Sequence, residues 1–411
     1  MTNNTLAPEQ INAAICFDVG LAHGLDVAET ARRFRAYAYI ERRSIKLLAG
    51  WFLRVPAYEM KYTLGYHLYD HAEHVSALRK RLEELRGGQP DASVPQGLRM
   101  LMEEALHAPD EASFLRGLYG VIKRALVEEY RAHLALCDKS ANANEVRLLR
   151  RMIEDLEAQL AWYDALKLGA GDAGFTARIT ALLQAAGGVI GHPVLPGAAT
   201  PPPAVARFER PKTLHFDARI QRKGLVSYET RGTLAPREAA IEQFKVFFNE
   251  AYAAAILAGM IFDAFEDSLP WEFFADFSRH FWDEVRHSEF GALRLKEFGH
   301  APETCDPTFY EASESLPILH RLTYLTLGLE VYFMPRKGRR VKEYSATGDH
   351  RSQLFADHDW SDETNHVHYG KHWVNHLLEH DTRTVEDVQE EVKAHLERVL
   401  GQPVKEFSAP Y

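Results

Sequence analysis

Residues 282–288 of the chain read Trp-Asp-Glu-Val-Arg-His-Ser, and residues 362–366 read Asp-Glu-Thr-Asn-His. Each stretch contains a glutamate followed by a histidine three positions later. Residues three apart lie on the same face of an α-helix, so Glu284 and His287 can reach one metal ion. Residues 363 and 366 repeat this arrangement. A carboxylate together with an imidazole suits iron or manganese. The two stretches therefore predict two helices that each supply metal ligands.

Two further glutamates stand one helical hairpin upstream of these motifs. Glu250 precedes Glu284 by 34 positions. Glu330 precedes Glu363 by 33 positions. Di-metal four-helix bundles take one glutamate from each of two helices and a Glu-x-x-His motif from each of the other two. The predicted metal ligands, which would also be the catalytic residues, are Glu250, Glu284, His287, Glu330, Glu363 and His366.

Turn-forming residues lie at the midpoint of both intervals. They are Asp-Ser-Leu-Pro at 267–270 and Ser-Ala-Thr-Gly at 345–348. With a rise of about 1.5 Å per residue, antiparallel helices joined by these turns bring all the ligands to one depth of a bundle. The neighbouring residues Phe247, Phe248 and Phe281 are apolar. Charged side chains among such neighbours are rarely tolerated without a partner or a metal.

An aspartate directly precedes each motif glutamate, Asp283 in the first stretch and Asp362 in the second. A carboxylate that accepts the other ring N–H of a ligand histidine would fix the tautomer and the orientation of that ring. We therefore expect the two aspartates to support the ligand histidines. A solvent-exposed aspartate is the alternative for either position taken alone.

Residues from about 236 to 380 resemble the ferritin-like di-iron carboxylate superfamily, which includes the ribonucleotide reductase small subunit and bacterial multicomponent monooxygenases. Asp283-Glu284-Val-Arg-His287 looks like the superfamily's Asp-Glu-x-Arg-His sequence. Residues 362–366 match it except for Asn365 in place of Arg. The resemblance implies two iron ions, with a manganese–iron pair as an alternative, and O2 as co-substrate. It also implies an oxygenase or oxidase that oxidises a small organic substrate.

The resemblance names no substrate, because members of one fold superfamily differ in function. Two other functions stay open: hydroxylation of a modified tRNA base, and iron or peroxide handling without catalysis. A pocket that reaches the metals would favour an enzyme that acts on an organic molecule. The sequence contains no GxGxxG or P-loop motif. Electrons would then come from an external donor or from the substrate itself.

Segments with helical periodicity fill both halves of the chain. Apolar residues recur three and four positions apart, as in Ile45, Leu48 and Phe52, which indicates amphipathic helices. Several such segments run for about 25 to 30 residues, a length typical of helical bundles. We therefore predict an all-α fold with two tandem ferritin-like four-helix bundles.

The composition changes between the two halves. The run Gly-Ala-Ala-Thr-Pro-Pro-Pro at 197–203 cannot continue a helix. We predict a degenerate ferritin-like helical domain at 1–167, a linker and accessory segment at 168–233, and a ferritin-like di-metal domain at 234–411. Weak alternation between 214 and 230 suggests a short β-hairpin within the linker.

The N-terminal half resembles a decayed copy of the di-metal half. The stretch around His71 can be laid on the stretch around Glu284, with Glu41 as the upstream carboxylate. In the fourth helix Leu156 and Gln159 replace the second motif's glutamate and histidine. We therefore expect a structural role for this half. The alternative is a mononuclear site made by Glu41, His71, His74 and Glu129.

The composition limits the binding partners and the cellular compartment that we expect for this protein. A formal net charge of −10 disfavours nucleic acid as a partner. No uninterrupted apolar run approaches the length of a membrane span, and residues 1–10 lack the features of a signal peptide. Three cysteines without CxxC spacing argue against a disulfide framework. We expect a cytoplasmic protein that acts on a small molecule and has no membrane partner, and that could form a homodimer.

Overall fold

The computed structural model describes residues 24–90, 94–191, 207–216, 218–267, 269–405 and 407. Helices make up 74% of the structure and strands 1%, which confirms the all-α prediction. Residues 1–10 and the Gly- and Pro-rich run at 197–203, on which two of the expectations rest, lie outside the described residues.

The chain divides into two compact units that do not follow the chain order. The first comprises Met1–Ile40, Ala77–Ala105 and Ala112–Pro203, and the second comprises Glu41–Ser76, Leu106–Glu111 and Ala204–Tyr411. The division is interleaved because helices α2 (Val27–Arg54) and α3 (Tyr58–Glu84) each contribute to both units. The linear boundaries at 167/168 and 233/234 stay a prediction.

The first unit contains a group of packed helices. They are α4 (Gln96–Leu106), α5 (Glu111–Leu115), η1 (Arg116–Lys123), α6 (Arg124–Leu136), α7 (Ala143–Ala165) and α8 (Ala173–Ala185). Helix α7 shows why they pack: Leu149, Met152 and Leu156 recur on one face and are fully buried. That face lies against α6 and η1.

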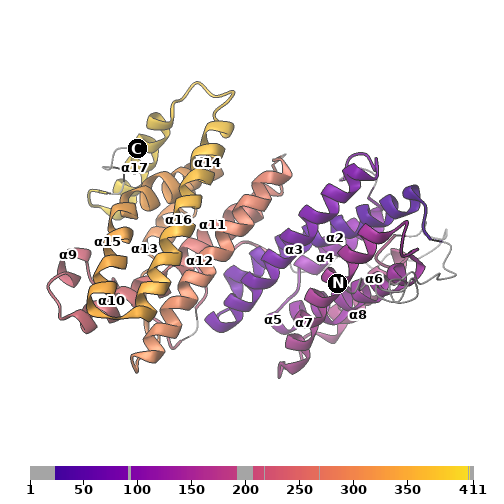
Figure 1. The fold of residues 1–411 in the computed structure, drawn as a ribbon, viewed down its shortest axis with the longest axis horizontal. Coiled ribbons are helices and arrows are strands. Elements are labelled where there is room, and N and C mark those ends of the chain that lie inside the picture. Colours follow the sequence, from indigo (N-terminus) through magenta and orange to yellow (C-terminus); the bar gives the residue numbers. More distant parts are fainter. Residues whose placement is uncertain are drawn as a thin grey trace, which may run out of the picture. The chain divides into compact units, whose positions relative to one another are not determined.

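The second unit contains the helices that carry the predicted ligands. In chain order they are α9 (Tyr228–Arg231), α10 (Pro236–Asn249), α11 (Ala251–Ala264), α12 (Trp271–Glu297), α13 (Thr308–Ser313), α14 (Ile318–Leu322), η2 (Thr323–Glu330), α15 (Val331–Thr347), α16 (His350–Leu377) and α17 (Val385–Leu400). Helices α10 and α11 pack against α12, while η2 and α15 pack against α16. Helix α12 also packs against α16, which joins the two hairpins (Figure 1).

Both upstream glutamates lie where a helix loses its regularity. Glu250 separates α10 from α11. Glu330 ends the π-helical segment η2, and single π-helical turns occur frequently at functional sites. The two Glu-x-x-His motifs lie instead within the uninterrupted helices α12 and α16.

Two glycines allow the helices around these glutamates to approach closely. A Cβ atom on Gly291 of α12 would lie 2.1 Å from the backbone nitrogen of Phe248 in α10. A Cβ atom on Gly370 of α16 would lie 2.1 Å from the Thr326 hydroxyl in η2. At the first contact Ser288 Oγ donates a hydrogen bond of 2.7 Å to the Phe248 carbonyl. These close contacts therefore fix how the two helices of each pair are aligned along their length, next to the predicted ligands.

The β-hairpin suggested for residues 214–230 does not form among the described residues. The two-residue strand β1 (Gln221–Arg222) pairs in parallel with β2 (Thr304–Cys305). The partner strand comes from the segment after α12, so the accessory segment is joined to the C-terminal half by a non-local pairing. Part of the expected linker is also helical, since it contains α8.

One helical stretch is long and apolar enough to cross a membrane by length and composition alone. It covers Pro236–Ala264, which is α10 and α11 together, with a mean hydropathy of 1.3 in its most apolar window. Within that window 67% is buried inside the protein. A buried core helix passes the same test, so the stretch is weak evidence for a membrane partner.

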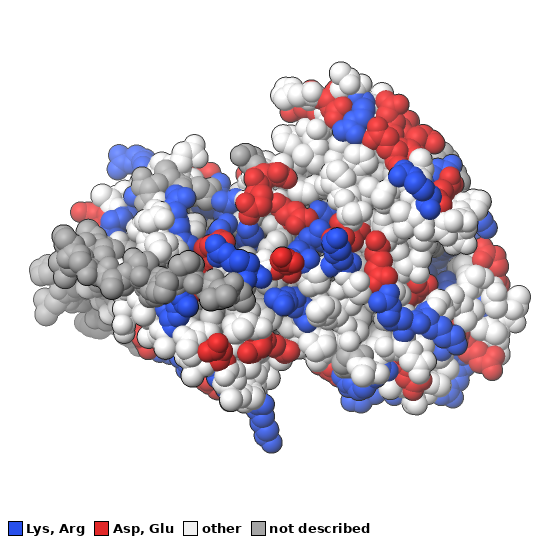
Figure 2. Space-filling model, turned by 180° about the vertical axis from the view of Figure 1, so that it is seen from behind, with Lys and Arg blue, Asp and Glu red and all other residues white. Residues whose placement is uncertain are grey.

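Charged side chains of both signs are scattered among uncharged ones on one face of the molecule. On the face shown in Figure 2, acidic and basic groups of the described residues are interspersed. Neither sign forms a continuous band across the described part of that face. The net charge of −10 is therefore spread rather than concentrated there.

Candidate metal centre

The structure brings the six predicted ligands together in the second unit. Five of them are almost completely buried, with relative exposures of 0 to 4%. They are Glu284, His287, Glu330, Glu363 and His366. Glu250 is half-buried as a residue, and its Oε2 atom is buried. Their role as metal ligands stays a prediction, but their proximity does not depend on it.

One group of potential ligand atoms lies between α12, η2 and α16. It comprises His280, Glu284, Glu330 and His366, whose nearest donor atoms all lie within 4.8 Å of one another. His280 Nε2 lies 2.8 Å from Glu330 Oε1. His366 Nδ1 lies 3.4 Å from Glu284 Oε1. The group offers two imidazoles and two carboxylates to one cation.

A second group shares Glu284 with the first. It comprises Glu250, Glu284 and His287, and it continues through His287 to Asp359 and Glu363. His287 Nδ1 lies 3.4 Å from Glu250 Oε2 and 3.8 Å from Glu284 Oε2. Glu284 belongs to both groups, and its Oε1 faces the first group while its Oε2 faces the second. A carboxylate in that place can bridge two metals.

Buried polar atoms without hydrogen-bond partners concentrate at this centre. Among the described residues they include Glu250 Oε2, Glu284 Oε2, His287 Nδ1, Glu330 Oε1 and Oε2, Glu363 Oε2 and His366 Nδ1. Leaving a buried donor or acceptor unsatisfied costs about 1–3 kcal/mol, and more for a charged group. Divalent cations would satisfy these atoms together. The donor set therefore fits iron or manganese.

Each motif histidine is held by the aspartate of the opposite motif. His287 Nε2 lies 3.2 Å from Asp362 Oδ2, and His366 Nε2 lies 3.3 Å from Asp283 Oδ2. Both rings therefore turn their Nδ1 atoms toward the carboxylate cluster, which is the arrangement that orients ligand histidines in metal proteins. The aspartates were expected to support the histidines, and only the structure shows that the support crosses between α12 and α16.

Arginines contact both aspartates and hold Asp283 in the charged form. Arg279 Nε donates to Asp283 Oδ2 at 2.9 Å, and Arg286 Nη1 donates to Asp283 Oδ1 at 2.5 Å. Arg286 also reaches Asp362 Oδ2 at 3.3 Å. Although burial opposes it, contacts with His366 and Arg279 lower the pKa of Asp283 to about 2. Arg286 is the arginine of the Asp-Glu-x-Arg-His stretch, and it contacts the aspartates of both motifs. The second motif therefore needs no arginine of its own, and Asn365 stands at that position.

A buried lysine approaches the same cluster from α15. Lys337 Nζ donates to Asp359 Oδ1 at 2.6 Å and to Glu363 Oε1 at 2.8 Å. Lys337 is 4% exposed. Its ammonium group offsets part of the negative charge that the buried carboxylates would otherwise leave uncompensated.

Three members of this centre were not predicted from the sequence. His280 lies four residues before Glu284, and Asp359 lies four residues before Glu363. Both therefore extend the ligand face of their helix by one turn. The four-residue spacing from a motif glutamate could have indicated both residues in the sequence, although a single histidine or aspartate at such a position is common on helices. Lys337 carries no such signal, because its partners lie on another helix.

The pKa shifts at the centre predict how the metal-free protein responds to pH. Burial raises the pKa of Glu363 to about 7, an effect that Lys337 opposes and Glu284 increases. A raised carboxyl pKa stabilises the fold below the unfolded value, and the contribution is lost as pH rises through the folded value. Burial lowers the pKa of His366, but contacts with the carboxylates of Asp283 and Glu284 outweigh burial and raise this pKa to about 10. The stability that His366 contributes to the fold is therefore also lost as pH rises. We therefore expect the melting temperature of chelator-treated protein to fall by about 5 °C or more between pH 5 and pH 8.

Metal should reverse this trend, because cations bind the deprotonated ligands and replace the protons. Differential scanning calorimetry with and without ferrous or manganous ion tests the expectation. Glu363→Gln should reduce the fall in melting temperature of the metal-free protein between pH 5 and pH 8. A metal-free melting temperature that rises over this interval would contradict the assignment.

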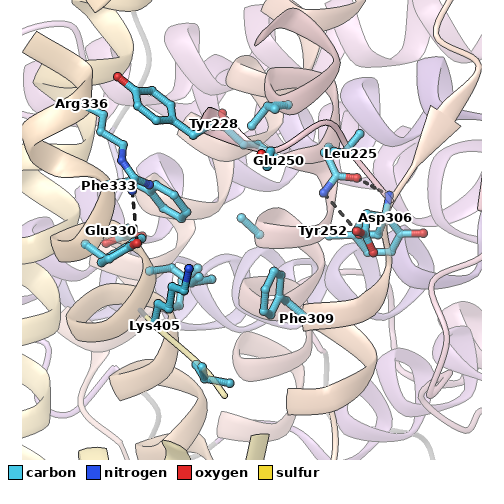
Figure 3. Close-up of a pocket in the computed structure, with 18 of the residues that line it drawn as sticks. Leu225, Tyr228, Glu250, Tyr252, Asp306, Phe309, Glu330, Phe333, Arg336 and Lys405 are labelled. Carbon is cyan, nitrogen blue, oxygen red and sulfur yellow. Dashed lines mark hydrogen bonds between the residues drawn. The ribbon is translucent and has the colours of Figure 1, made fainter. Parts of the chain in front are cut away.

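A cavity of about 640 Å³ reaches the centre from one side. The four predicted ligand glutamates, Glu250, Glu284, Glu330 and Glu363, all form part of its wall. Much of the remaining wall is apolar and includes Ile256, Phe309, Leu329 and Phe333. Figure 3 shows the rings of Phe309 and Phe333 turned into this space, near Glu330 and Glu250. Ligand pockets in proteins typically enclose about 300–1,000 Å³, so the cavity can hold a small organic molecule.

The N-terminal half forms a separate and smaller cluster. Glu41 contacts the Nδ1 atoms of His71 and His74, the latter at 3.3 Å, and all three residues are buried. They belong to the second compact unit, whereas Glu129 belongs to the first, where it pairs with Arg33 at 2.8 Å. The trio Glu41, His71 and His74 could hold a metal, and a mononuclear site that also uses Glu129 stays a prediction.

In the N-terminal half, the two fourth-helix positions that align with the second Glu-x-x-His motif are buried in the interior. Leu156 is fully buried, and Gln159 accepts a hydrogen bond of 2.6 Å from Lys123 Nζ. Lys123 ends the π-helical segment η1, just as Glu330 ends η2. Gln159, which the sequence comparison aligns with His366, is thus paired with an ammonium group. The lack of a second di-metal site in the N-terminal half stays a prediction.

Comparison with known proteins gives one match. No curated protein and no solved structure matches the chain. A family model described as "Protein of unknown function (DUF455)" matches residues 175–408. That range is more than half of the chain, and it contains both ligand groups, the supporting aspartates and the cavity. The chain therefore belongs to the DUF455 family.

Proposed function

We propose that the protein is a non-haem di-metal oxidoreductase that uses O2 to oxidise a small organic molecule. The observation that carries this proposal is the cavity, because the four glutamates of the candidate centre form part of its wall. Storage or scavenging of iron requires no organic-sized space beside the metals. The likeness of residues 236–380 to di-iron carboxylate proteins supports the same function.

Two iron ions, or a manganese and an iron, would be held by the six predicted ligands with His280 and would supply electrons for the reduction of O2. The protein residues around them have definable tasks. Asp362 and Asp283 keep the Nε2 protons of His287 and His366, so that both Nδ1 atoms present a lone pair. Apolar residues of the wall, such as Ile256 and Phe309, limit the access of water to the centre.

Metal content and oxygen uptake test this proposal directly. Protein purified from cells grown with added iron should contain about two metals per chain, because the ligand set is that of a dinuclear site. After chemical reduction under nitrogen, mixing with air-saturated buffer should consume O2 in proportion to bound metal. The measurements are inductively coupled plasma mass spectrometry and an oxygen electrode.

The control variant is His71→Ala, which alters the separate Glu41 cluster. It should keep the metal and the oxygen uptake of the natural protein. Less than about one metal per chain in the natural protein would refute a dinuclear centre. Two metals with no oxygen uptake after reduction would refute the proposed activity and leave a metal-binding protein.

A further inference from the structure

Three arginines line the cavity beside the candidate metal centre. Arg231 comes from α9, and Arg336 and Arg340 come from successive turns of α15. Burial and the neighbouring Arg340 lower the pKa of Arg231 to about 10, so its guanidinium remains charged at neutral pH. The three positive charges are therefore close enough to act on one another.

Two of these guanidinium groups form no close ion pair with a carboxylate among the described residues, although Glu242 and Glu229 act on them at longer range. Arg231 donates to the Val226 carbonyl and lies over the Tyr228 ring at 5.8 Å. Arg336 donates to the Tyr332 hydroxyl at 3.2 Å and lies over the Tyr228 ring at 4.6 Å. Their contacts are thus carbonyl, hydroxyl and aromatic groups, none of which carries a negative charge.

Arginines elsewhere near the centre are paired differently. Arg286 contacts Asp283, and Arg294 donates to Asp349 at 2.7 Å. Arg340 is intermediate, since its Nη1 lies 3.8 Å from Asp359 Oδ2. A half-buried arginine without an acid is costly unless an anion arrives to pair with it. The cavity therefore contains unused capacity to bind a negative charge.

The acidic residues of the wall do not cancel this capacity. Four of the carboxylates are the predicted metal ligands, and two divalent cations would balance their charge. The other two are Glu229, which is exposed, and Asp306, whose Oδ1 accepts a hydrogen bond of 3.0 Å from the Thr308 amide. Neither forms an ion pair with Arg231 or Arg336 in the described part of the chain.

The wall carries both positive and apolar groups, and Figure 3 shows a further cation, Lys405, near Glu330. Figure 3 shows Arg336 beside Tyr228 at one side of the cavity, and Tyr252 with Asp306 at the other. Phe333 and Phe309 lie between them. A molecule with a charged head and an apolar body matches a wall that offers both kinds of group.

We infer that the cavity binds an organic anion, a carboxylate or a phosphate monoester with an apolar body, whose head group pairs with Arg231 and Arg336. The inference rests on the proposed function and deepens it by naming the substrate class. Both head groups can accept two parallel hydrogen bonds from a guanidinium.

Isothermal titration calorimetry with matched eight-carbon probes tests this inference. Octanoate and octyl phosphate should bind at least about ten-fold more tightly than octan-1-ol or octylamine, because only the anions pair with the arginines. Arg336→Met and Arg231→Met should each weaken anion binding about ten-fold or more. The matched control is Arg339→Met, which changes an exposed arginine of the same helix that does not line the cavity. The tighter of the two anions identifies the head group.

The titrations should be repeated after treatment with a chelator, with metal content measured in each sample. Loss of anion binding in the two arginine variants with and without metal supports the inference. Equal affinity for octanoate and octan-1-ol would overturn it, as would anion binding that depends on metal but not on the arginines. Neither variant alters a predicted ligand, so metal content and oxygen uptake report separately on the proposed function.

Discussion

Glu284→Gln is expected to reduce bound metal from about two ions per chain to nearly none, because the dinuclear ligand set depends on this residue. Glu284 is the member shared by both groups of ligand atoms. Its carboxylate lies within 3.8 Å of His280, His287 and His366. An amide of the same shape removes the negative charge that both cation positions use, so the loss should exceed that of any other single ligand substitution.

The fold should survive this substitution, because glutamine preserves the volume of the side chain. Circular dichroism would show whether the helices persist, and mass spectrometry of the purified variant would give its metal content. Glu272→Gln serves as the control, since Glu272 is an exposed glutamate of the same helix. If Glu284→Gln kept two metals per chain, the dinuclear site would have to lie elsewhere.

Gly291→Ala is expected to destabilise the fold by about 3 kcal/mol or more, because the added methyl group meets backbone atoms that cannot rotate away. The Cβ atom would lie 2.1 Å from the Phe248 nitrogen and 2.6 Å from its Cα atom. Relief requires α10 to move away from α12. That movement breaks the hydrogen bond from Ser288 to Phe248 and shifts Glu250, two residues further on, away from His287.

Two readouts distinguish this effect from simple loss of stability. Urea unfolding measures the change in free energy, and metal titration of the folded fraction measures the displacement of Glu250. Gly169→Ala is the comparison, since a Cβ atom there would meet nothing within 4 Å. Equal stability of the two alanine variants would show that α10 and α12 do not pack as closely as the structure indicates.

The local features of the centre were predictable because they follow from helix geometry. A spacing of three residues defines one helix face whatever the helix packs against. Glu284 and His287 could therefore be assigned together, and so could Glu363 and His366. The upstream glutamates Glu250 and Glu330 could be found because a turn at the midpoint of each interval returns the chain to the same depth.

The remaining members of the centre depend on contacts between helices. Lys337 reaches Glu363 from α15, and Asp283 supports His366 across the gap between α12 and α16. Such pairings depend on the rotation of each helix about its axis, which packing against neighbours decides. The π-helical segment that ends at Glu330 likewise depends on packing, and no residue type within η2 indicates it in the sequence.

The sequence by itself determined that the protein is helical, that two of its helices carry Glu-x-x-His motifs, and which glutamates return to meet them. These conclusions need only the helical repeat and the positions of turns, both of which are local properties of the chain. The tertiary structure alone decided that the aspartates cross between motifs, that residues 41–76 join the second unit, and that unpaired arginines share a cavity with the ligand glutamates. Each of these arises from side chains far apart in sequence, whose meeting depends on how helices pack rather than on how each one forms.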